Sequence, residues 1–167
     1  VHDAVLERAR RAKEASAVLR SASTDTKNKA LQRMAELLRA KHAKITRANA
    51  IDMENGQTKG LSSAMLDRLR LDEKRIEDMA IACEEIASLE DPVGHVLDEW
   101  ERPNGMRIYK VAVPMGVIGI IYESRPNVTV DSVALCLKAG NTVLLRGGSE
   151  AINSNVALAE ILQDACE

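Results

Sequence analysis

The chain has 167 residues, 46% of them hydrophobic, so it is long and apolar enough to form one domain with a real core. Acidic and basic residues nearly cancel to a net charge of -2, and the aromatic residues are one Trp and two Tyr, which argues against a nucleic-acid-binding or membrane-surface protein. No segment approaches the roughly 18 apolar residues of a membrane-spanning helix, and the first residues lack the pattern of a signal peptide.

The three cysteines predict a reducing compartment and no metal site. Cys83, Cys136 and Cys166 are far apart and odd in number, which fits neither a disulfide framework nor a zinc site. Each lies in an apolar pattern with helical spacing, so we expect buried free thiols. With the composition, this predicts a cytoplasmic protein that binds neither nucleic acid nor membranes.

The first ninety residues have the periodicity of helices. Residues 1–22 form one apolar stripe, and the polar cluster at 23–25 is suited to capping the next helix. That helix has Leu31, Met34, Leu38 and Ile45 on one stripe, with Lys and Arg on its other faces, until Gly56 and Gly60 interrupt the pattern. A short helix at 63–69 follows Ser62, and Asp72 opens another. The result is a helical layer that needs another layer to cover.

Residues 95–113 predict a β-hairpin. Two extended runs flank Pro103-Asn104-Gly105, and Asn-Gly favours a hairpin because both turn positions tolerate a positive φ. An isolated two-stranded ribbon is only marginally stable in water, so we expect this segment to act as an arm that pairs with another chain.

The last third has the pattern of an α/β fold. The continuous apolar run at 116–122 is typical of a parallel strand covered on both faces, and the helix expected at 128–140 ends at Gly140. A second strand at 142–146 and a final helix follow. Strand, helix, strand, helix is half of a doubly wound parallel sheet, so the predicted fold is a helical layer on a partial sheet of this kind with a hairpin arm.

Two polar loops follow the predicted strands, where open α/β sheets bind ligands. In the second loop, Gly147 and Gly148 allow a close backbone approach, Arg146 can hold a phosphate, and Ser149 and Glu150 can bond ligand hydroxyls. The plainer interpretation is a turn in which Ser149 caps the helix and Glu150 compensates its dipole. The residues alone favour this structural interpretation.

The first loop, Glu123-Ser124-Arg125-Pro126-Asn127, offers Arg125 as an anion clamp and Asn127 as an amide donor for an oxyanion. The structural interpretation is a capping loop in which Asn127 or Thr129 caps the helix. The residues alone favour neither interpretation.

The segment PMGVIGIIYESRPNVTVDSVALCLKAGNTVLLRGGSEAINSN, residues 114–155, resembles gamma-glutamyl phosphate reductases of the aldehyde dehydrogenase superfamily, and so do KGLSSAMLDRLRLDEKRI at 59–76 and RPNGMRIYKVAVPMGV at 102–117. The resemblance covers essentially the whole chain. It identifies the chain as the N-terminal part of a longer enzyme, in which 1–94 is the helical part of the cofactor-binding domain, 95–113 an oligomerisation arm, and 114–167 the first β-α-β-α part of the dinucleotide-binding domain.

The resemblance implies NADPH-dependent reduction of L-glutamyl 5-phosphate to glutamate 5-semialdehyde and phosphate in proline biosynthesis, through a thioester on a cysteine that this chain lacks. It implies cofactor binding by Arg146, Gly147, Gly148, Ser149 and Glu150, where other members carry Lys-Pro-Ser-Glu. It implies substrate binding by Arg125 and Asn127, with Asn127 as the oxyanion candidate. It also implies that the hairpin is an oligomerisation arm and that the enzyme has a functional partnership with glutamate 5-kinase. Because two strands leave a sheet edge uncovered, we expect a homo-oligomer formed through the hairpin or this exposed edge.

Two alternatives remain at this point. One is another aldehyde or acyl-phosphate dehydrogenase, although the Glu-Ser-Arg-Pro-Asn loop in place of Pro-Trp-Asn argues against a simple aldehyde oxidiser. The other is a non-catalytic nucleotide-binding or oligomerisation fragment. Because the catalytic cysteine is missing, we expect the chain by itself to be inactive.

Overall fold

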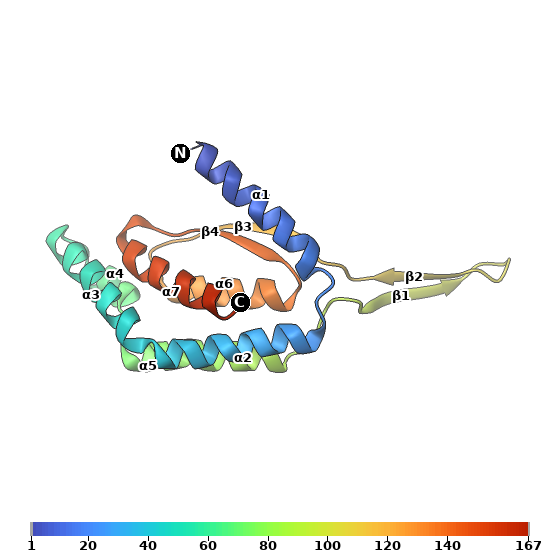
Figure 1. The fold of residues 1–167 in the computed structure, drawn as a ribbon, viewed down its shortest axis with the longest axis horizontal. Helices are drawn as coiled ribbons and strands as arrows, with labels where there is room; N and C mark the ends of the chain where they lie inside the picture. Colours follow the sequence, from blue (N-terminus) through green and yellow to red (C-terminus); the bar gives the residue numbers. More distant parts are fainter. Residues whose placement is uncertain (1, 167) are drawn as a thin grey trace.

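The computed structural model of the chain describes residues 2–166, so the predicted elements are compared within that range. Helix α1 lies on one face of a two-stranded parallel sheet, α6 and α7 lie on the other, and α2 and α5 form a further layer below them (Figure 1). The elements are α1 His2–Leu19, α2 Thr24–Ala40, α3 His42–Thr58, α4 Ser63–Leu69, α5 Glu73–Ser88, β1 Val96–Glu101, β2 Arg107–Val111, β3 Val117–Ile121, α6 Asn127–Lys138, β4 Thr142–Arg146, the 3-10 helix η1 Ser149–Ala151 and α7 Ile152–Asp164. The predicted α/β fold class, a helical layer over a partial parallel sheet with a hairpin, is confirmed.

The predicted caps of α2, α4 and α5 are present. The Ser23 hydroxyl accepts a hydrogen bond from the Thr26 NH at 3.1 Å, and Ser62 and Asp72 cap α4 and α5 in the same way. Such caps satisfy NH groups that have no partner inside the helix.

The helix predicted through Ile45 is two helices, because the chain turns at Lys41. Beyond this point α3 leaves α2 and packs against α7, and the ion pair between Lys41 and Asp164 lies at the junction. Gly56 does not interrupt the pattern as predicted. It lies inside α3, and a Cβ there would meet Leu61 Cδ1 at 3.0 Å, so the glycine lets the segment leading into α4 pack closely on the helix.

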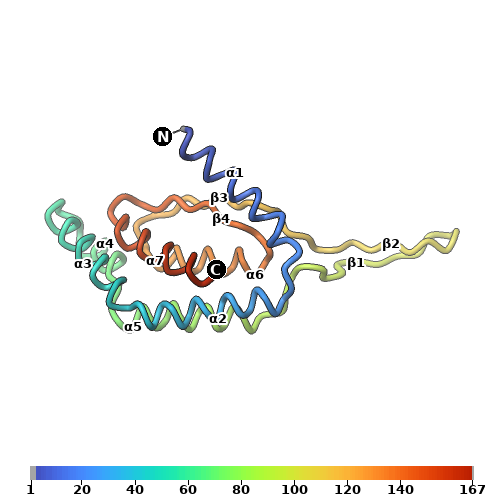
Figure 2. Tube along the Cα trace, viewed as in Figure 1, coloured from blue at the N-terminus to red at the C-terminus, as the bar shows by residue number. Residues whose placement is uncertain are grey.

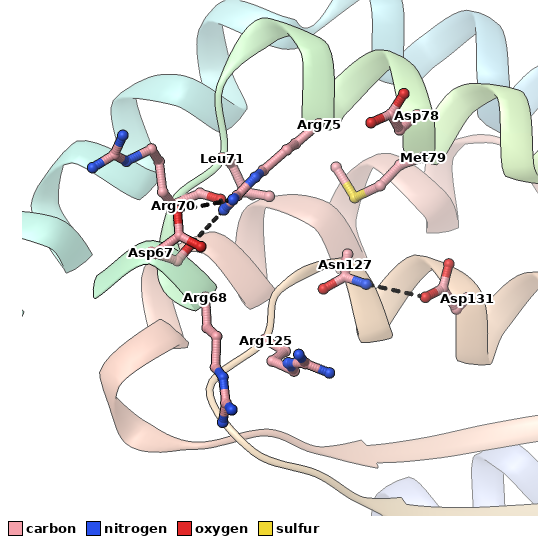
Figure 3. A pocket seen from close by; sticks show the side chains of 10 residues that line it. All are labelled: Asp67, Arg68, Arg70, Leu71, Arg75, Asp78, Met79, Arg125, Asn127 and Asp131. Atoms are coloured by element: carbon pink, nitrogen blue, oxygen red, sulfur yellow. Dashed lines mark hydrogen bonds and ion pairs between the residues drawn. The ribbon is translucent and has the colours of Figure 1, made fainter. Parts of the chain in front are cut away.

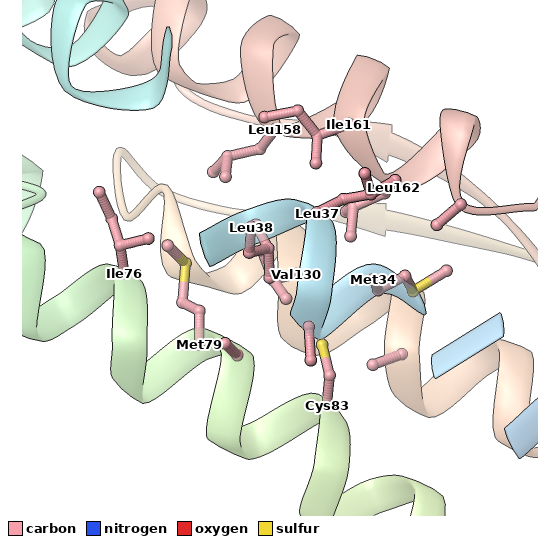
Figure 4. Packing of buried hydrophobic residues seen from close by; sticks show 14 of the residues in the cluster. Met34, Leu37, Leu38, Ile76, Met79, Cys83, Val130, Leu158, Ile161 and Leu162 are labelled. Atoms are coloured by element: carbon pink, nitrogen blue, oxygen red, sulfur yellow. The ribbon is translucent and has the colours of Figure 1, made fainter. Parts of the chain in front are cut away.

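The core is built mainly from helices rather than from the sheet. Buried side chains of α2, α5, α6 and α7 interdigitate (Figure 4), while the strands are half-buried or exposed. Its members include Leu31, Met34, Leu38, Ile76, Met79, Val130, Leu158 and Ile161. The helices that precede the hairpin in the sequence and those that follow it therefore share one core.

Strands β3 and β4 pair in parallel, as predicted, with Val117 opposite Thr142 and Ile121 opposite Arg146. Helix α6 between them ends at the predicted glycine: Gly140 has φ +72°, its NH bonds to Leu137 O, and the Asn141 NH bonds to Cys136 O. This pair of bonds is a Schellman motif, which satisfies the last carbonyls of the helix and favours glycine. Asn141 then accepts a bond from the Gly116 NH at 2.8 Å, which joins the starts of the two strands.

Strands β1 and β2 form the predicted antiparallel hairpin, which projects from the body (Figure 2). Of the predicted turn pair, only Gly105 has a positive φ, of +80°. Its NH bonds to Arg102 O, so Pro103 and Asn104 are the central turn residues. Proline suits the first central position because its ring fixes φ at about −65°, close to the value that this position of a common β-turn requires. All of β1 is exposed, and pairing of this arm with another chain stays a prediction.

Two lysines buried among α2, α5 and α6 cross-link the helical layers near the root of the hairpin. Lys27 and Lys138 are 2% and 3% exposed. The Lys27 ammonium pairs with Asp91 at 2.6 Å and donates to Lys138 O, while the Lys138 ammonium donates to Asn28 Oδ1 and Ala87 O. The sequence analysis put the lysines and arginines of the second helix on faces other than its apolar stripe, yet Lys27 is as buried as the stripe itself.

The three cysteines differ in exposure, contrary to the prediction. Cys83 is buried in the core, Cys136 is half-buried and Cys166 is exposed, and all three are free thiols. Burial raises the pKa of Cys83 to about 12, so this thiol is inert. In residues 2–166, no helix combines the length and apolarity that crossing a membrane requires.

Candidate functional site

The two polar loops predicted to carry function lie side by side at the carboxyl ends of β3 and β4. The Tyr122 NH donates to Arg146 O at 3.1 Å, and the Ser124 hydroxyl donates to Glu150 Oε2 at 2.6 Å. The hairpin leaves from the opposite end of the molecule (Figure 2). The candidate site and the arm are therefore spatially separate.

The two glycines of the second loop lie in close contact with the first loop, Tyr122 and the start of α7. A Cβ at Gly147 would lie 2.3 Å from Asn155 Nδ2, and one at Gly148 would lie 2.2 Å from Ser124 Oγ. Neither glycine has a positive φ, so the requirement is space rather than backbone conformation. A larger residue at Gly147 would have to displace the side chains of Asn155 and Tyr122, and one at Gly148 would displace the Ser124 side chain and press on its backbone nitrogen at 3.1 Å.

The polar residues of the second loop are arranged differently from the capping interpretation. Ser149 caps no helix: it lies in η1, and its hydroxyl donates to Glu150 Oε1 at 3.1 Å. The hydroxyls of Ser124 and Ser149 and the backbone NH of Glu150 hold the pKa of this carboxyl below its usual range. Arg146 is exposed at the end of β4, and its side chain makes no hydrogen bond within residues 2–166. The loop thus presents one unengaged cation and one ionised carboxylate.

The N-terminus of α7, directly after this loop, is held by a carboxylate from α3 that the sequence analysis missed. Asp52 is 1% exposed, and its two oxygens accept bonds from the backbone NH and side chain of both Asn153 and Ser154, at 2.6 to 3.2 Å. Asn49, one turn earlier, bonds Ser154 Oγ, Leu69 O and the Leu71 NH. This network fixes the second loop and the segment before α5 to one helix.

In the first loop, neither Asn127 nor Thr129 caps α6. Asn127 is the first residue of the helix, and its Nδ2 donates to Asp131 Oδ2 at 3.2 Å. The Thr129 hydroxyl is buried between Tyr122 OH at 2.6 Å and Asn155 Oδ1 at 3.1 Å. The capping interpretation of these two residues is therefore wrong, and one amide hydrogen of Asn127 remains for another acceptor.

Arg125 and Asn127 line a pocket of about 350 Å³ together with residues of α4, α5 and the segment between them (Figure 3). Arg68, Arg75 and Asp78 come from these elements, and Asp131 lies one turn into α6. Burial raises the pKa of Asp131, although the hydrogen bond from Asn127 acts in the opposite direction. The structure thus places Arg125 and Asn127 in a polar pocket. Residues 146–150 are not part of its lining, and they are joined to the first loop through Ser124.

Local sequence signals could have found only part of this pocket. The i, i+4 spacing of Asn127 and Asp131 is a signal that the two side chains meet on one helix face. No short-range pattern brings α4 to the loop after β3, because that contact depends on the packing of α3 against α7. Within residues 2–166, no cluster of three or more His, Cys, Asp or Glu side chains is placed to hold a metal ion.

Comparison with known proteins places this arrangement in a family. A gamma-glutamyl phosphate reductase of Halothermothrix orenii is 58% identical over 98% of this chain, which covers 39% of that protein. The crystal structure of the gamma-glutamyl phosphate reductase of Thermotoga maritima has a TM-score of 0.94 and 51% identity over 96% of this chain and 39% of that one. The crystal structure of the gamma-glutamyl phosphate reductase of Saccharomyces cerevisiae has a TM-score of 0.89 and 35% identity over 94% of this chain and 40% of that one.

The chain spans about two fifths of the length of the curated relatives it matches. The sequence pattern shared by members of the aldehyde dehydrogenase family matches residues 2–166 of the chain. The gamma-glutamyl phosphate reductases of Halothermothrix orenii, Thermotoga maritima and Saccharomyces cerevisiae are among its relatives, and the chain belongs to the aldehyde dehydrogenase family.

Proposed function

We propose that this chain is the cofactor-binding part of an enzyme that reduces L-glutamyl 5-phosphate with NADPH, giving glutamate 5-semialdehyde and phosphate. Members of its family use nicotinamide cofactors. The observation that carries the proposal is the joining of the two polar loops, with Ser124 bonded to Glu150 at the carboxyl ends of parallel strands. This is the edge at which α/β sheets bind nucleotides and their substrates.

The residues of the second loop fit a phosphorylated dinucleotide. Arg146 offers an exposed guanidinium for a phosphate. Gly147 and Gly148 carry no side chain, which allows the close approach of this loop to Tyr122 and Ser124. Ser149 offers a hydroxyl, and Glu150 keeps lone pairs beyond those used by the two serines. When bound, the nicotinamide cofactor supplies the hydride.

The residues of the first loop fit the acyl group of the substrate. Asn127 has an amide hydrogen to donate to an oxyanion, and its bond to Asp131 fixes the plane of the amide. Arg125 lines the same pocket and supplies positive charge for an anionic group of the substrate. The nucleophilic cysteine comes from a part of the enzyme outside this chain, since burial raises the pKa values of Cys83, Cys136 and Cys166 and none of the three lines the pocket.

The test is the reverse reaction in a full-length enzyme carrying this chain. We expect oxidation of glutamate 5-semialdehyde to require both NADP⁺ and inorganic phosphate, because the phosphate accepts the acyl group while NADP⁺ accepts the hydride. Absorbance of NADPH is the readout. An enzyme that oxidises the aldehyde equally well without phosphate, with water as acceptor, would overturn the proposal, and the chain alone serves as the inactive control.

Cofactor preference tests the roles of Arg146 and Glu150. We expect Arg146→Ala to lower kcat/KM for NADPH relative to NADH by about 1–3 kcal/mol, because a charged contact with the 2′-phosphate is lost. Glu150→Gln should raise the same ratio, because the ionised carboxylate repels that phosphate. An unchanged ratio in Arg146→Ala would assign the discrimination to another residue.

Further parts of the proposal concern the setting of the enzyme. We propose that it acts in the cytoplasm, a setting consistent with three free cysteines. The reaction consumes an acyl phosphate that hydrolyses readily in water, so functional coupling to the kinase that produces it, glutamate 5-kinase, is chemically favourable.

A further inference from the structure

The pocket beside the first loop has its charges divided between two sides. Arg68 and Arg125 lie together on one side, while Asp78 and Asp131 lie on the other with Asn127 next to Asp131 (Figure 3). The apolar part of the lining comes from Leu71 and Met79, which are 4% and 3% exposed. A pocket of this kind suits a small molecule that carries both charges and a short apolar stretch.

The two arginines on the cationic side are available for a ligand. Arg125 makes no side-chain hydrogen bond or ion pair with residues 2–166, and Arg68 comes no closer than 3.7 Å to Glu123. The other arginines of the pocket differ from these. Arg75 is bonded to Asp67 and to the backbone of Arg70, and Arg70 points away from Arg125 and Asn127 (Figure 3).

The acidic side has unused capacity for a cation. Asp131 receives one bond from Asn127 and is otherwise desolvated by burial, which raises its pKa. Asp78 makes no side-chain hydrogen bond with any residue in the described part of the chain. A half-buried carboxylate with few partners gains from a neighbouring ammonium group, because the cation offsets the cost of desolvation.

Building on the proposed function, we propose that this pocket binds the α-amino-acid end of the substrate. Arg68 and Arg125 bind the α-carboxylate, Asp78 and Asp131 bind the α-ammonium group, and the side-chain methylenes lie over Met79 and Leu71. Guanidinium groups bind carboxylates through paired hydrogen bonds, which fixes the orientation of the ligand. The reacting carbon then lies on the Asn127 side of the pocket, so the same residues select the substrate and aim it.

The experiment measures oxidation of glutamate 5-semialdehyde with NADP⁺ and phosphate in a full-length enzyme carrying this chain. We expect Arg68→Gln and Asp78→Asn each to lower kcat/KM for the aldehyde by about 10- to 100-fold, chiefly through KM, because each removes a charge-assisted bond. The KM values for phosphate and NADP⁺ stay unchanged. Arg70→Gln, which removes the same charge from the pocket rim without reaching Asn127, changes kcat/KM by less than about threefold.

Two substrate analogues separate recognition from a general loss of activity. 5-Oxopentanoate lacks the ammonium group, so it should abolish the effect of Asp78→Asn and keep that of Arg68→Gln. 4-Aminobutanal lacks the carboxylate, so it should do the reverse. A structural defect would instead lower activity with every aldehyde by the same factor.

Each outcome decides the inference. If the unmodified enzyme shows no phosphate-dependent oxidation of glutamate 5-semialdehyde, the proposed function fails. If it does and Arg68→Gln and Asp78→Asn behave like Arg70→Gln, this inference alone fails. A rise in KM for phosphate without a change in KM for the aldehyde would make the pocket a phosphate site, which also overturns the inference.

Discussion

Replacing Lys27 by methionine should lower the free energy of unfolding of the chain by about 3–5 kcal/mol, because it leaves the carboxylate of Asp91 without its buried partner. The two side chains are only 2% and 11% exposed, and Lys27 also donates to Lys138 O between α2 and α6. Methionine nearly matches the volume of lysine, so the loss reports the interaction rather than a cavity. Urea unfolding followed by circular dichroism measures it.

A neighbouring lysine provides the control. Lys29 pairs with Asp25 at 2.7 Å, but both side chains are more than 70% exposed, so Lys29→Met should leave the unfolding midpoint almost unchanged. The double variant Lys27→Met/Asp91→Asn should be more stable than Lys27→Met, since it removes the uncompensated charge together with its partner. Equal losses in Lys27→Met and Lys29→Met would contradict the assignment.

The same pair makes stability depend on pH. Although burial opposes ionisation of Asp91, the bonds from Lys27, Thr24 and the Val93 NH together hold its pKa below the usual value. In the unfolded chain this carboxyl takes up its proton near pH 4, so below that pH the unfolded state binds more protons than the folded state. The stabilisation is therefore present above about pH 4 and is lost as the pH falls through the lower pKa of the folded chain, and Asp91→Asn should remove this part of the pH dependence.

Asp52→Asn should cost about 2–3 kcal/mol of unfolding free energy, because an amide group would meet donors that now bond a carboxylate. The Asp52 carboxylate accepts from two backbone NH groups and two side chains at the start of α7. Because that helix follows the second loop, we also expect a full-length enzyme with this change to show a larger rise in KM for the cofactor than for the aldehyde. Thermal unfolding and steady-state kinetics measure the two effects.

Asp25→Asn is the matched control for this change, since Asp25 is 72% exposed and its substitution removes an acid from a neighbouring helix without touching the core. If both substitutions lower the melting temperature equally, the Asp52 network does not stabilise α7. If Asp52→Asn lowers stability but raises KM for both substrates alike, the network supports the fold without positioning the second loop.

The parallel unit could be predicted because its signals are local. The apolar run at 116–122 and the glycine after α6 mark a strand and a helix end whatever the rest of the chain does, and the structure has both. The caps at Ser23, Ser62 and Asp72 were predictable for the same reason. The apolar stripe from Leu31 to Ile45 was misleading, because it stays buried across the turn at Lys41, first against α5 and then against α7.

The polar interior could not be predicted from periodicity. Lysine and aspartate are rarely fully buried, so Lys27, Lys138 and Asp52 would each be placed in solvent by any local rule. Each is buried because its partner comes from a segment at least 50 residues away in the chain. The candidate loops were identified from sequence, but their alignment through Ser124 and Glu150, and the contribution of α4 and α5 to the pocket, depend on the packed helices.

The contrast between the hairpin and its root has a consequence for how this sequence can change during evolution. Within residues 2–166, strands β1 and β2 pair only with each other and contribute no buried side chain to the core, so nearly any residue compatible with a strand is tolerated there by the fold of a single chain. At the root, Lys27 and Asp91 depend on each other, so a change in either one is selected against unless the other changes too. The arm is therefore free to drift and acquire new contact surfaces, while the point from which it projects stays fixed.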